Sequence, residues 1–281
     1  MMTTQAAFFD HLSYAGRHVV VTGAASGIGE ATARLLESLG AEVHTLDRVP
    51  SSVGHDHQAD LRDPASIERA IAEIGGPIHA LFNSAGVGTE VTAAELLLVN
   101  FVGTRHVVDN VVPLMPPGSA IVTVSSSAGA RWREHVDDVR PLVETSGFAA
   151  GKAWTDAAAA HGMPANEANF LSRFALHLYT VAKAQQLAAR GIRVNTVSAF
   201  ATLTPMFASF LARVSDEVGA SISGLGGRRG LPAEQAYALA FINSDAAGYI
   251  NGTDLLVDGG NIAAQDFGEA VNLPPVTQPR R

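Results

Sequence analysis

The sequence contains no cysteine among its 281 residues. Disulfide bonds, thiolate metal ligands and a cysteine nucleophile are therefore excluded. Also lacking is any apolar run of about 18 residues, the length that a transmembrane helix needs. The opening residues MMTTQAAFFDHLSYAG lack the basic segment and the apolar core of a signal peptide. Together these absences lead us to expect a cytoplasmic protein.

Clusters of basic residues are missing as well. The chain has 19 lysine and arginine residues against 27 acidic residues, for a net charge of −8. Because the basic residues do not gather along the chain, neither nucleic acid nor a membrane surface is expected as a partner. Aromatic residues are scarce at 6%, whereas apolar residues reach 47% and glycines number 27. That composition fits a buried core around a sheet that small side chains pack closely.

Short apolar runs alternate with helical patterns along most of the chain. Buried strands are expected at residues 18–22, 41–46, 78–83, 120–125, 192–198 and 254–258. Between the first two, apolar residues recur from Ile28 to Leu39 at helical spacing, and Gly40 ends the helix. This alternation predicts a single α/β domain over residues 1–281, built on a Rossmann-type doubly wound parallel sheet.

Three further segments stand outside this alternation. Residues 130–168 are expected to form an insertion before the helix that leads to the sixth strand, and residues 200–230 a loop. Long segments of this kind are often functional, so both are expected on the substrate side. Residues 261–281 are expected to form a C-terminal tail.

A glycine-rich turn, VVVTGAASGIGEA, follows the first strand. A strand, a tight glycine turn and a helix N-terminus together receive a pyrophosphate on backbone N–H groups. Asp47 closes the second strand 20 residues after Gly27, where a carboxylate accepts ribose hydroxyls and repels a 2′-phosphate. NAD is therefore the expected cofactor, although Arg48 lies beside Asp47. A turn that merely packs the helix on the strand is the alternative.

From Arg17 to Gly260 the sequence resembles the short-chain dehydrogenase/reductase family. The resemblance rests on the glycine-rich turn and on the motifs ADL (59–61), NSAG (83–86), LLLVNFVGT, IVTVSSSAG, GIRVN (191–195) and TDLLVDGG (253–260). The short segment after NSAG and the long one after SSSAG are similar to the subgroup that contains 3α-hydroxysteroid dehydrogenases. The cofactor-binding residues that the resemblance implies are Gly23, Ser26, Gly27, Ile28, Gly29, Asp47, Arg48, Asp60, Leu61, Asn83, Ala85, Gly86, Arg173 and Thr204.

In this family a tyrosine exchanges a proton with the substrate oxygen, a lysine four residues later holds the nicotinamide ribose, and a serine positions the substrate. Ser126 matches that serine, and Asn100 matches an asparagine that helps to hold a proton-relay water. The stretch NFLSRFALHLYTVAK offers two candidates for the remaining pair. One is Tyr179 with Lys183, and the other is Asn169 with Arg173.

The family spacing favours the second pair. It places the tyrosine about 26 residues before the asparagine of RVN. Counting back from Asn195 gives Asn169 (195 − 26 = 169), and the lysine position becomes Arg173. Tyr179 would then lie about 15 Å further along the same helix and on another side of it. The expected catalytic residues are therefore Ser126, Asn100, Asn169 and Arg173. A helix shifted in register, which would return Tyr179 to the site, is the alternative.

The exchanged pair changes the chemistry that the site can perform. Asn169 can donate a hydrogen bond but cannot deliver a proton, and Arg173 cannot release one. Loss of general acid–base catalysis typically costs about 10²–10⁴ in rate. Phe200 stands where the family has the glycine of a Pro-Gly bend, so we expect it to narrow the nicotinamide end.

The insertion holds titratable side chains that could replace the missing acid, although a solvated surface is the simpler interpretation of each. They are His135, Asp137, Glu144, Lys152, His161 and Glu167. His55 and His57, in GHDHQAD, have a spacing that could suggest a metal. We expect them in a solvated loop after the second strand, and no metal site is predicted.

Three classes of function remain open. The first is an NAD-dependent oxidoreductase of a bulky alcohol or ketone, with Ser126, water or an insertion residue handling the proton. The second is a lyase, dehydratase or isomerase that retains NAD, and the third is a catalytically silent NAD-binding protein. The helix expected at residues 170–190 carries an apolar face with Phe170, Phe174, Leu178 and Val181, and Leu171, Ala175 and Ala182 nearby. This helix carries more apolar surface than its packing on the sheet can bury, so a homodimer or homotetramer is expected.

Overall fold

A seven-stranded parallel sheet forms the centre of the computed structural model, which describes residues 9–267. Its strands follow the order β3-β2-β1-β4-β5-β6-β7. They are β1 His18–Thr22, β2 Glu42–Asp47, β3 His55–Gln58, β4 Ala80–Asn83, β5 Ala120–Ser126, β6 Arg193–Ala199 and β7 Asp254–Val257. The order reverses between β1 and β4, so the predicted doubly wound sheet is confirmed.

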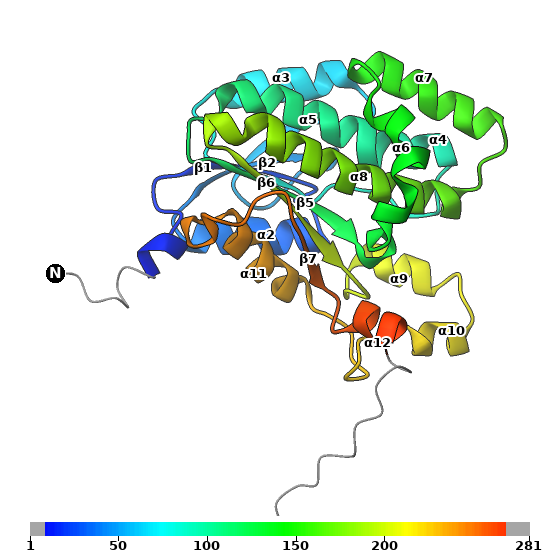
Figure 1. Cartoon of the computed structure of the whole chain (residues 1–281). Helices are drawn as coiled ribbons and strands as arrows, with labels where there is room; N and C mark the ends of the chain where they lie inside the picture. The colour runs from blue at the N-terminus through cyan, green and yellow to red at the C-terminus, as the bar shows by residue number, and fades with distance from the viewer. Residues whose placement is uncertain (1–8, 268–281) are drawn as a thin grey trace, which may run out of the picture.

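Helices cover both faces of the sheet. Figure 1 shows α2 and α11 on one face and α3, α5 and α8 on the other. The helices are α2 Gly27–Ser38, α3 Pro64–Ile74, α4 Ala93–Leu97, α5 Thr104–Val111, α6 Val136–Val143, α7 Gly147–Ala160, α8 Ala165–Leu187, α9 Pro205–Leu211, α10 Asp216–Ser221, α11 Pro232–Asn243 and α12 Asn261–Phe267. A π-helical turn, η1 Leu98–Gly103, joins α4 to α5. Each face of the sheet has its own apolar core, because successive side chains of a strand point to opposite faces.

Local sequence sets where several helices begin. Asp63 accepts a hydrogen bond from the Ala65 N–H, and Pro64 occupies the first position of α3. Thr204 accepts one from the Phe207 N–H, and a proline again follows directly in α9. The first N–H groups of a helix have no carbonyl partner within it. A side-chain oxygen just before the helix accepts from one of them, and a proline at the first position has no N–H to satisfy.

Strand β3 departs from the sequence prediction, which placed His55 and His57 in a loop. The segment His55–Gln58 pairs with β2 instead, with His44 opposite His55. Its four residues are all polar and mostly exposed, because β3 is the outermost strand of the sheet. An edge strand of this composition gives no apolar alternation, so periodicity alone cannot detect it.

The insertion predicted at residues 130–168 folds into α6 and α7. These helices pack against α8 and α4 respectively. Arg105 is buried beneath their connection and donates hydrogen bonds to the carbonyl oxygens of Thr145 (3.0 Å) and Gly147 (2.8 Å). A buried arginine thus fixes the insertion to the helical layer of the domain.

The insertion also covers much of the apolar face of α8. Phe174 and Ala175 are buried, and the ring of His135 stacks on Phe174 at 4.4 Å between centroids. Phe170 stays 48% exposed, and Ala182 is exposed as well. The apolar surface that α8 leaves for contact with another subunit is therefore much smaller than the sequence predicts.

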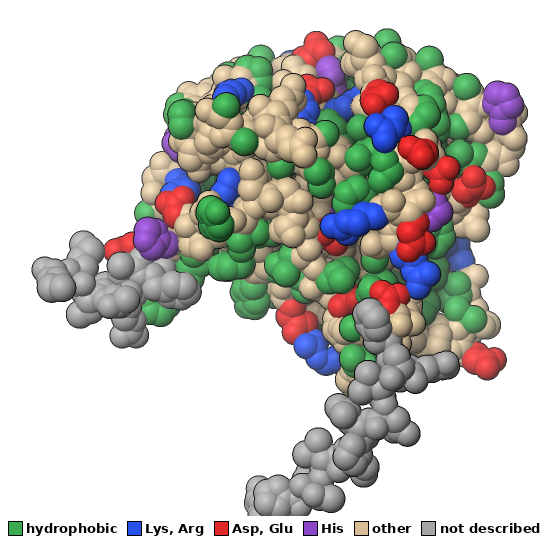
Figure 2. Space-filling model, viewed as in Figure 1, with side chains coloured by type: hydrophobic (Ala, Val, Ile, Leu, Met, Phe, Trp, Pro, Cys, Tyr) green, Lys and Arg blue, Asp and Glu red, His purple; other side chains and the backbone are tan. Residues whose placement is uncertain are grey.

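The surface is mixed in charge on the side shown in Figure 2, where lysine and arginine side chains lie scattered among acidic ones. Across residues 9–267, the helices are all too short or too polar to cross a membrane.

Candidate active site

A cavity of about 940 Å³ opens at the carboxyl ends of the strands. Its wall includes Gly23 after β1, Asp47 at the end of β2, Ser84 after β4 and Ser126 at the end of β5. Ligands of doubly wound sheets bind at this edge, where the strand order reverses. Most of the residues that the sequence assigned to the site line this cavity. They are Gly23, Ser26, Gly27, Ile28, Gly29, Asp47, Arg48, Asp60, Leu61, Ala85, Gly86, Ser126, Asn169, Arg173 and Thr204.

The glycine-rich turn lies against the start of α2. A Cβ atom on Gly29 would come within 2.1 Å of the Gly23 carbonyl oxygen. Gly23 has φ +71°, and a Cβ there would lie 2.6 Å from Ala85. Ser26 precedes the helix without a side-chain cap, so its own hydroxyl does not occupy the first amides of α2. The bare backbone and open helix N-terminus fit a pyrophosphate.

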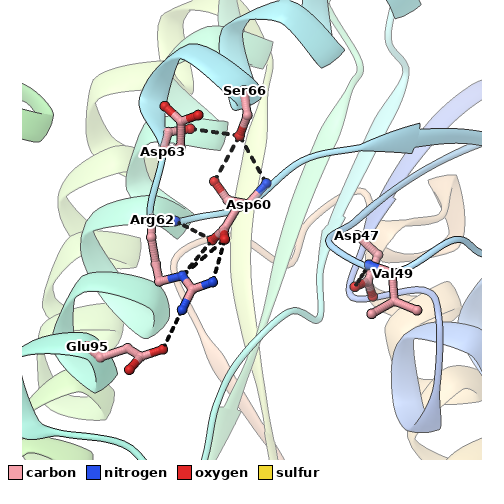
Figure 3. Close-up of polar contacts among 7 residues, drawn as sticks. All are labelled: Asp47, Val49, Asp60, Arg62, Asp63, Ser66 and Glu95. Atoms are coloured by element: carbon pink, nitrogen blue, oxygen red, sulfur yellow. Dashed lines mark hydrogen bonds and ion pairs between the residues drawn. The ribbon is translucent and has the colours of Figure 1, made fainter.

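Asp47 is held in place by the backbone on both of its oxygens. Oδ2 accepts a hydrogen bond from the Ala25 N–H (3.0 Å) and Oδ1 accepts one from the Val49 N–H (3.1 Å; Figure 3). The carboxylate therefore lies between the glycine-rich turn and the cavity. Its free lone pairs fit ribose hydroxyls. Arg48, next to it, is exposed at the cavity wall.

Asp60 makes hydrogen bonds within the protein that the sequence did not predict. The Arg62 guanidinium donates to both of its oxygens, from Nε at 2.9 and 3.1 Å and from Nη2 at 2.6 Å (Figure 3). Arg62 also donates from Nη1 to Glu95 Oε1 at 2.8 Å. Hydrogen bonding to Arg62 lowers the pKa of Asp60, which stays a carboxylate. Arg62 was missed, although it stands two residues after Asp60 in ADLRD and lines the same wall.

Ser126, Asn169 and Arg173 also line the cavity. Ser126 ends β5, while Asn169 and Arg173 lie one turn apart on α8. Burial lowers the pKa of Arg173 to about 10, so the guanidinium remains charged near neutral pH. Its Nε is buried without a partner, and it makes no ion pair or hydrogen bond with any residue from 9 to 267. Arg173 as a whole is half-buried, and a cation that is partly removed from water without a partner is costly, so Arg173 is suited to bind the oxygen atoms of a ligand.

Tyr179 and Lys183 lie elsewhere. They contribute to a separate depression of about 450 Å³, lined also by Arg105 and Asp109. Asp109 Oδ1 accepts hydrogen bonds from the Tyr179 hydroxyl (3.3 Å) and from Lys183 Nζ (2.9 Å). The ring of Tyr179 packs edge-on against Phe101. The Tyr-x-x-x-Lys motif therefore anchors α8 to α5 and does not face the large cavity.

Asn83 and Asn100, both assigned to the site from sequence, do not line the cavity. The amide of Asn100 lies in the π-helical turn and holds the backbone of Val87, accepting from its N–H (2.8 Å) and donating to its carbonyl (3.0 Å). Asn83 donates to Thr123 Oγ1 at 3.3 Å. Both side chains are buried supports behind the wall. A π-helical turn is often found near a functional site, but sequence spacing does not reveal it.

Apolar side chains also line the cavity that Ser126 and Arg173 line. They come from α8, from the loop over residues 200–230 and from α12: Phe170, Phe200, Met206, Phe207, Phe210 and Ile262. The segment over residues 200–230, which contains α9 and α10, therefore contributes to the cavity wall. Within the described chain, none of residues 130–168 lines the cavity.

The titratable side chains of the insertion lie outside the lining of this cavity. His135 pairs with Asp138 (2.8 Å), Lys152 pairs with Asp156 (2.7 Å), and His161 Nδ1 contacts the Ala157 carbonyl (2.6 Å). None of these six candidates reaches the cavity wall formed by the described residues: His135, Asp137, Glu144, Lys152, His161 and Glu167.

Comparison with known proteins gives two family matches. Residues 17–137 match a protein-family model described as short chain dehydrogenase, and residues 136–261 match one described as Enoyl-(Acyl carrier protein) reductase.

Individual relatives span nearly the whole chain. A coniferyl-alcohol dehydrogenase of Pseudomonas sp. strain HR199 is 32% identical over 248 residues, 87% of this chain and 96% of that protein. A (+)-cis,trans-nepetalactol synthase of Nepeta racemosa is 29% identical, over 90% of this chain and 96% of that protein. The crystal structure of a 3-alpha-hydroxysteroid dehydrogenase from Pseudomonas sp. B-0831, complexed with NADH, superimposes with a TM-score of 0.76 at 28% identity. That match covers 90% of this chain and 99% of the other.

Proposed function

The chain belongs to the short-chain dehydrogenase/reductase family, and on that basis we propose that it is an NAD-dependent oxidoreductase that interconverts a hydroxyl and a carbonyl group on a bulky, largely apolar molecule. One observation carries the proposal. A single cavity joins the glycine-rich turn and Asp47 to Ser126, Asn169 and Arg173, with apolar side chains beyond them.

The cofactor half of the proposal rests on Asp47. When bound, the nicotinamide cofactor supplies or accepts the hydride. The backbone amides of Ala25 and Val49 orient the Asp47 carboxylate, which would accept the adenosine ribose hydroxyls and repel a 2′-phosphate. The related dehydrogenase structure that contains NADH agrees with a nicotinamide cofactor. The preference for NAD over NADP is our inference from Asp47.

The reacting end would rely on hydrogen bonds and charge. Ser126 Oγ can donate a hydrogen bond to the substrate oxygen, and the Asn169 amide N–H can donate a second one that orients that oxygen. The cationic Arg173 would bind ribose hydroxyls and stabilise negative charge on the oxygen. Neither Asn169 nor Arg173 can act as the proton donor, so the proton would pass through the Ser126 hydroxyl and solvent water. Without a tyrosine acid, turnover is expected to be slower by about 10²–10⁴.

The substrate class follows from the apolar wall. Phe200, Phe207, Phe210 and Ile262 bring aromatic and aliphatic surface to the cavity that Ser126 also lines. Such a wall fits a ring system better than a small polar alcohol. Two relatives are named for substrates of that kind, a coniferyl alcohol and a 3-alpha-hydroxysteroid. We extend this class, aromatic or polycyclic alcohols, to the present chain.

The cofactor is tested by fluorescence titration with NADH and NADPH. NADH should bind more tightly, and Asp47→Ser should weaken NADH binding and narrow the preference, because a ribose acceptor and a 2′-phosphate repulsion are lost together. Asp56→Ser, an exposed carboxylate on the neighbouring strand that does not line the cavity, is the matched control. Tighter binding of NADPH to the parent protein would refute the NAD assignment.

The reaction is tested by incubating the protein with NAD and either coniferyl alcohol or a 3α-hydroxysteroid, and following NADH absorbance. Slow but enzyme-dependent NADH formation is expected, and it should be lost in Ser126→Ala. Intact NADH binding with no redox turnover on any alcohol or ketone of this class would contradict the proposal.

A second candidate function, non-redox chemistry with NAD retained, is favoured by the exchanged pair itself. Asn169 and Arg173 can orient and polarise a substrate without a proton donor, and one relative is named a nepetalactol synthase. The two functions separate in one assay, because a lyase, dehydratase or isomerase forms product with no net change in NADH. Chromatography of the same reaction mixtures distinguishes them.

A further inference from the structure

Five histidines gather at the opposite end of the sheet from the cavity. His18 begins β1, His44 lies in β2, His55 and His57 lie in β3, and His79 precedes β4. Glu42 begins β2 directly beside His18, since the two residues are paired in register. His44 is likewise paired with His55. Paired positions of parallel strands, and residues two apart on one strand, point to the same face. The register therefore places His18, Glu42, His44 and His55 on one face of the sheet.

Three of these residues converge closely. His18 Nε2 lies 3.0 Å from Glu42 Oε2, and His44 Nε2 lies 3.5 Å from Glu42 Oε1. The ligand atoms of His18, Glu42 and His44 all lie within 4.8 Å of one another. Nitrogen and oxygen ligands at about 2.0–2.1 Å from a tetrahedral zinc ion are about 3.3 Å apart. The two closest separations bracket that value.

His44 supplies an independent sign of a missing partner. The residue is only 8% exposed, yet its Nε2 atom is buried without any hydrogen bond to a described residue. Its other nitrogen, Nδ1, lies 3.1 Å from His57 Nε2. An imidazole nitrogen buried beside a carboxylate oxygen at 3.5 Å needs a cation or a proton between the two atoms.

The neighbours of His44 favour one placement of its proton. His57 Nδ1 lies 3.5 Å from Glu73 Oε2, and a carboxylate there favours a proton on Nδ1 of His57. His57 Nε2 then carries a lone pair and accepts the proton of His44 Nδ1. His44 Nε2 is left with a lone pair that faces Glu42. This is the carboxylate–histidine arrangement that orients the ligands of metal sites.

We propose that His18, Glu42 and His44 form a binding site for a divalent first-row transition-metal ion of the zinc class, separate from the cofactor cavity. Two imidazoles and a carboxylate are the ligand set that zinc accepts while keeping a position for water. His18 and Glu42 keep 37% and 45% of their side chains exposed, so the site is open to solvent. His55, whose Nε2 lies 3.9 Å from Glu42 Oε1, is placed to assist.

The ion would act as a clamp and would take no part in the redox chemistry. It would join the first residue of β1 to two residues of β2, and through His57 and Glu73 it would extend to β3 and α3. The cluster and the glycine-rich turn lie at opposite ends of β1, about 13 Å apart along five strand residues. Metal occupancy should therefore raise the melting temperature and leave NADH affinity unchanged.

The proposal is tested on the full chain, purified without a histidine tag and stripped with a chelator. Zinc chloride is titrated by calorimetry, and cobalt chloride is titrated by its visible absorption. We expect one ion per chain, an intense tetrahedral cobalt spectrum and a rise in melting temperature. His44→Gln and Glu42→Gln should each weaken zinc binding by about tenfold or more, comparable with losses seen at metal sites. The matched control, His161→Gln on the exposed end of α7, should bind zinc like the parent.

His18→Gln keeps the test informative if His44→Gln fails to fold, because His18 is partly exposed and its loss leaves little buried surface unfilled. It should fold, bind NADH normally and lose zinc affinity. Zinc affinity unchanged in His18→Gln and Glu42→Gln, or a weak octahedral cobalt spectrum in the parent, would overturn the site.

Discussion

At the scale of single residues, Asn169 and Arg173 decide what chemistry the site can perform, because they stand where the family has its catalytic tyrosine and lysine. Both line the large cavity, as Ser126 does, while Tyr179 and Lys183 bind Asp109 outside it. The sequence contains both pairs ten residues apart. The register of the helix decides which pair faces the cavity, because the two pairs lie about 15 Å apart along the helix axis.

The first prediction concerns Tyr179. Tyr179→Phe should leave NADH affinity and turnover within a few-fold of the parent, because its hydroxyl contacts Asp109 outside the cavity. It should lower the free energy of unfolding by about 0.5–1.5 kcal/mol through the lost hydrogen bond. Arg173→Ala and Asn169→Ala should each lower turnover by about tenfold or more, equivalent to about 1.4 kcal/mol of activation free energy. Steady-state kinetics and urea unfolding measure both effects.

The opposite pattern would contradict this assignment. If Tyr179→Phe reduced turnover 100-fold or more while folding and NADH affinity stayed normal, Tyr179 and Lys183 would be the working pair. Lys183→Met serves as the control for general damage near Asp109, since it removes the second bond to the same carboxylate.

At the scale of elements, the sequence could locate α8 but could not predict how the insertion packs. The register of α8 could be counted from Asn195, because one continuous helix leads into β6. The side of the molecule on which α6 and α7 pack depends on tertiary contacts, such as those of buried Arg105 with the carbonyls of Thr145 and Gly147. Those contacts have no signature in local spacing. Strand β3 was missed for a related reason, since its polar residues pair only with a neighbour at the sheet edge.

Buried His177 on α8 and half-buried Asp254 at the start of β7 lie close together. His177 Nε2 lies 3.1 Å from Ser125 Oγ, and its Nδ1 lies 3.9 Å from Asp254 Oδ1. The hydroxyls of Thr196 and Ser198 donate to Asp254 Oδ1, each at 2.9 Å. Burial, reinforced by Arg173 and Arg133, lowers the pKa of His177 to about 3. Burial raises the pKa of Asp254 to about 6.

The second prediction is that these two groups give stability opposite dependences on pH. Neutral His177 has a folded pKa below its unfolded value near 6.5, so its contribution is present above pH ~6.5 and is lost as pH falls. Asp254 has a raised folded pKa, so its contribution is present below pH ~4 and is lost as pH rises through 6. The two nearly cancel in the parent protein between about pH 4 and 6.

Single variants should separate the two effects. Relative to the parent, His177→Gln should gain stability as pH falls from 6.5 to 4, and Asp254→Asn should lose it as pH falls from 6 to 4. Each slope has an upper limit of about 1.4 kcal/mol per pH unit. Urea unfolding between pH 4 and pH 7 measures both slopes. Slopes of the same sign in the two variants would show that the pair titrates as one unit.

At the scale of the whole molecule, the alternation of apolar runs and helices was enough to predict the doubly wound sheet. Six strands lie at the predicted places within a residue or two, because parallel strands buried on both faces need continuous apolar runs. The site was predictable where a motif fixes the backbone, as at Gly23 and Gly29. It was not predictable where distant segments meet. Arg62 on Asp60, Ile262 on the cavity wall and the five-histidine cluster all depend on contacts that only the folded chain brings together.

The third prediction is that the chain forms a homodimer or homotetramer through a surface other than α8. The insertion covers much of α8, whereas α11 leaves Tyr237 61% and Phe241 38% exposed. The neighbouring strand β7 is the last of the sheet and leaves Leu256 40% exposed. The Gln235 side chain binds the Val257 carbonyl at 2.9 Å and fixes this helix against that strand. An open sheet edge beside exposed aromatic residues is the kind of surface that a second copy covers.

Light scattering at micromolar concentration should therefore give at least twice the chain mass of 29.2 kDa. The double change Tyr237→Asp, Phe241→Asp should shift the mass toward that of one chain, because buried carboxylates across a two-fold contact are costly. Val218→Asp, on exposed α10, is the matched control and should leave the mass unchanged. A parent mass of 29.2 kDa would contradict the assembly altogether. A dimer that survives the double change would place the contact on another face, with the remaining exposed part of α8 around Phe170 as the next surface to alter.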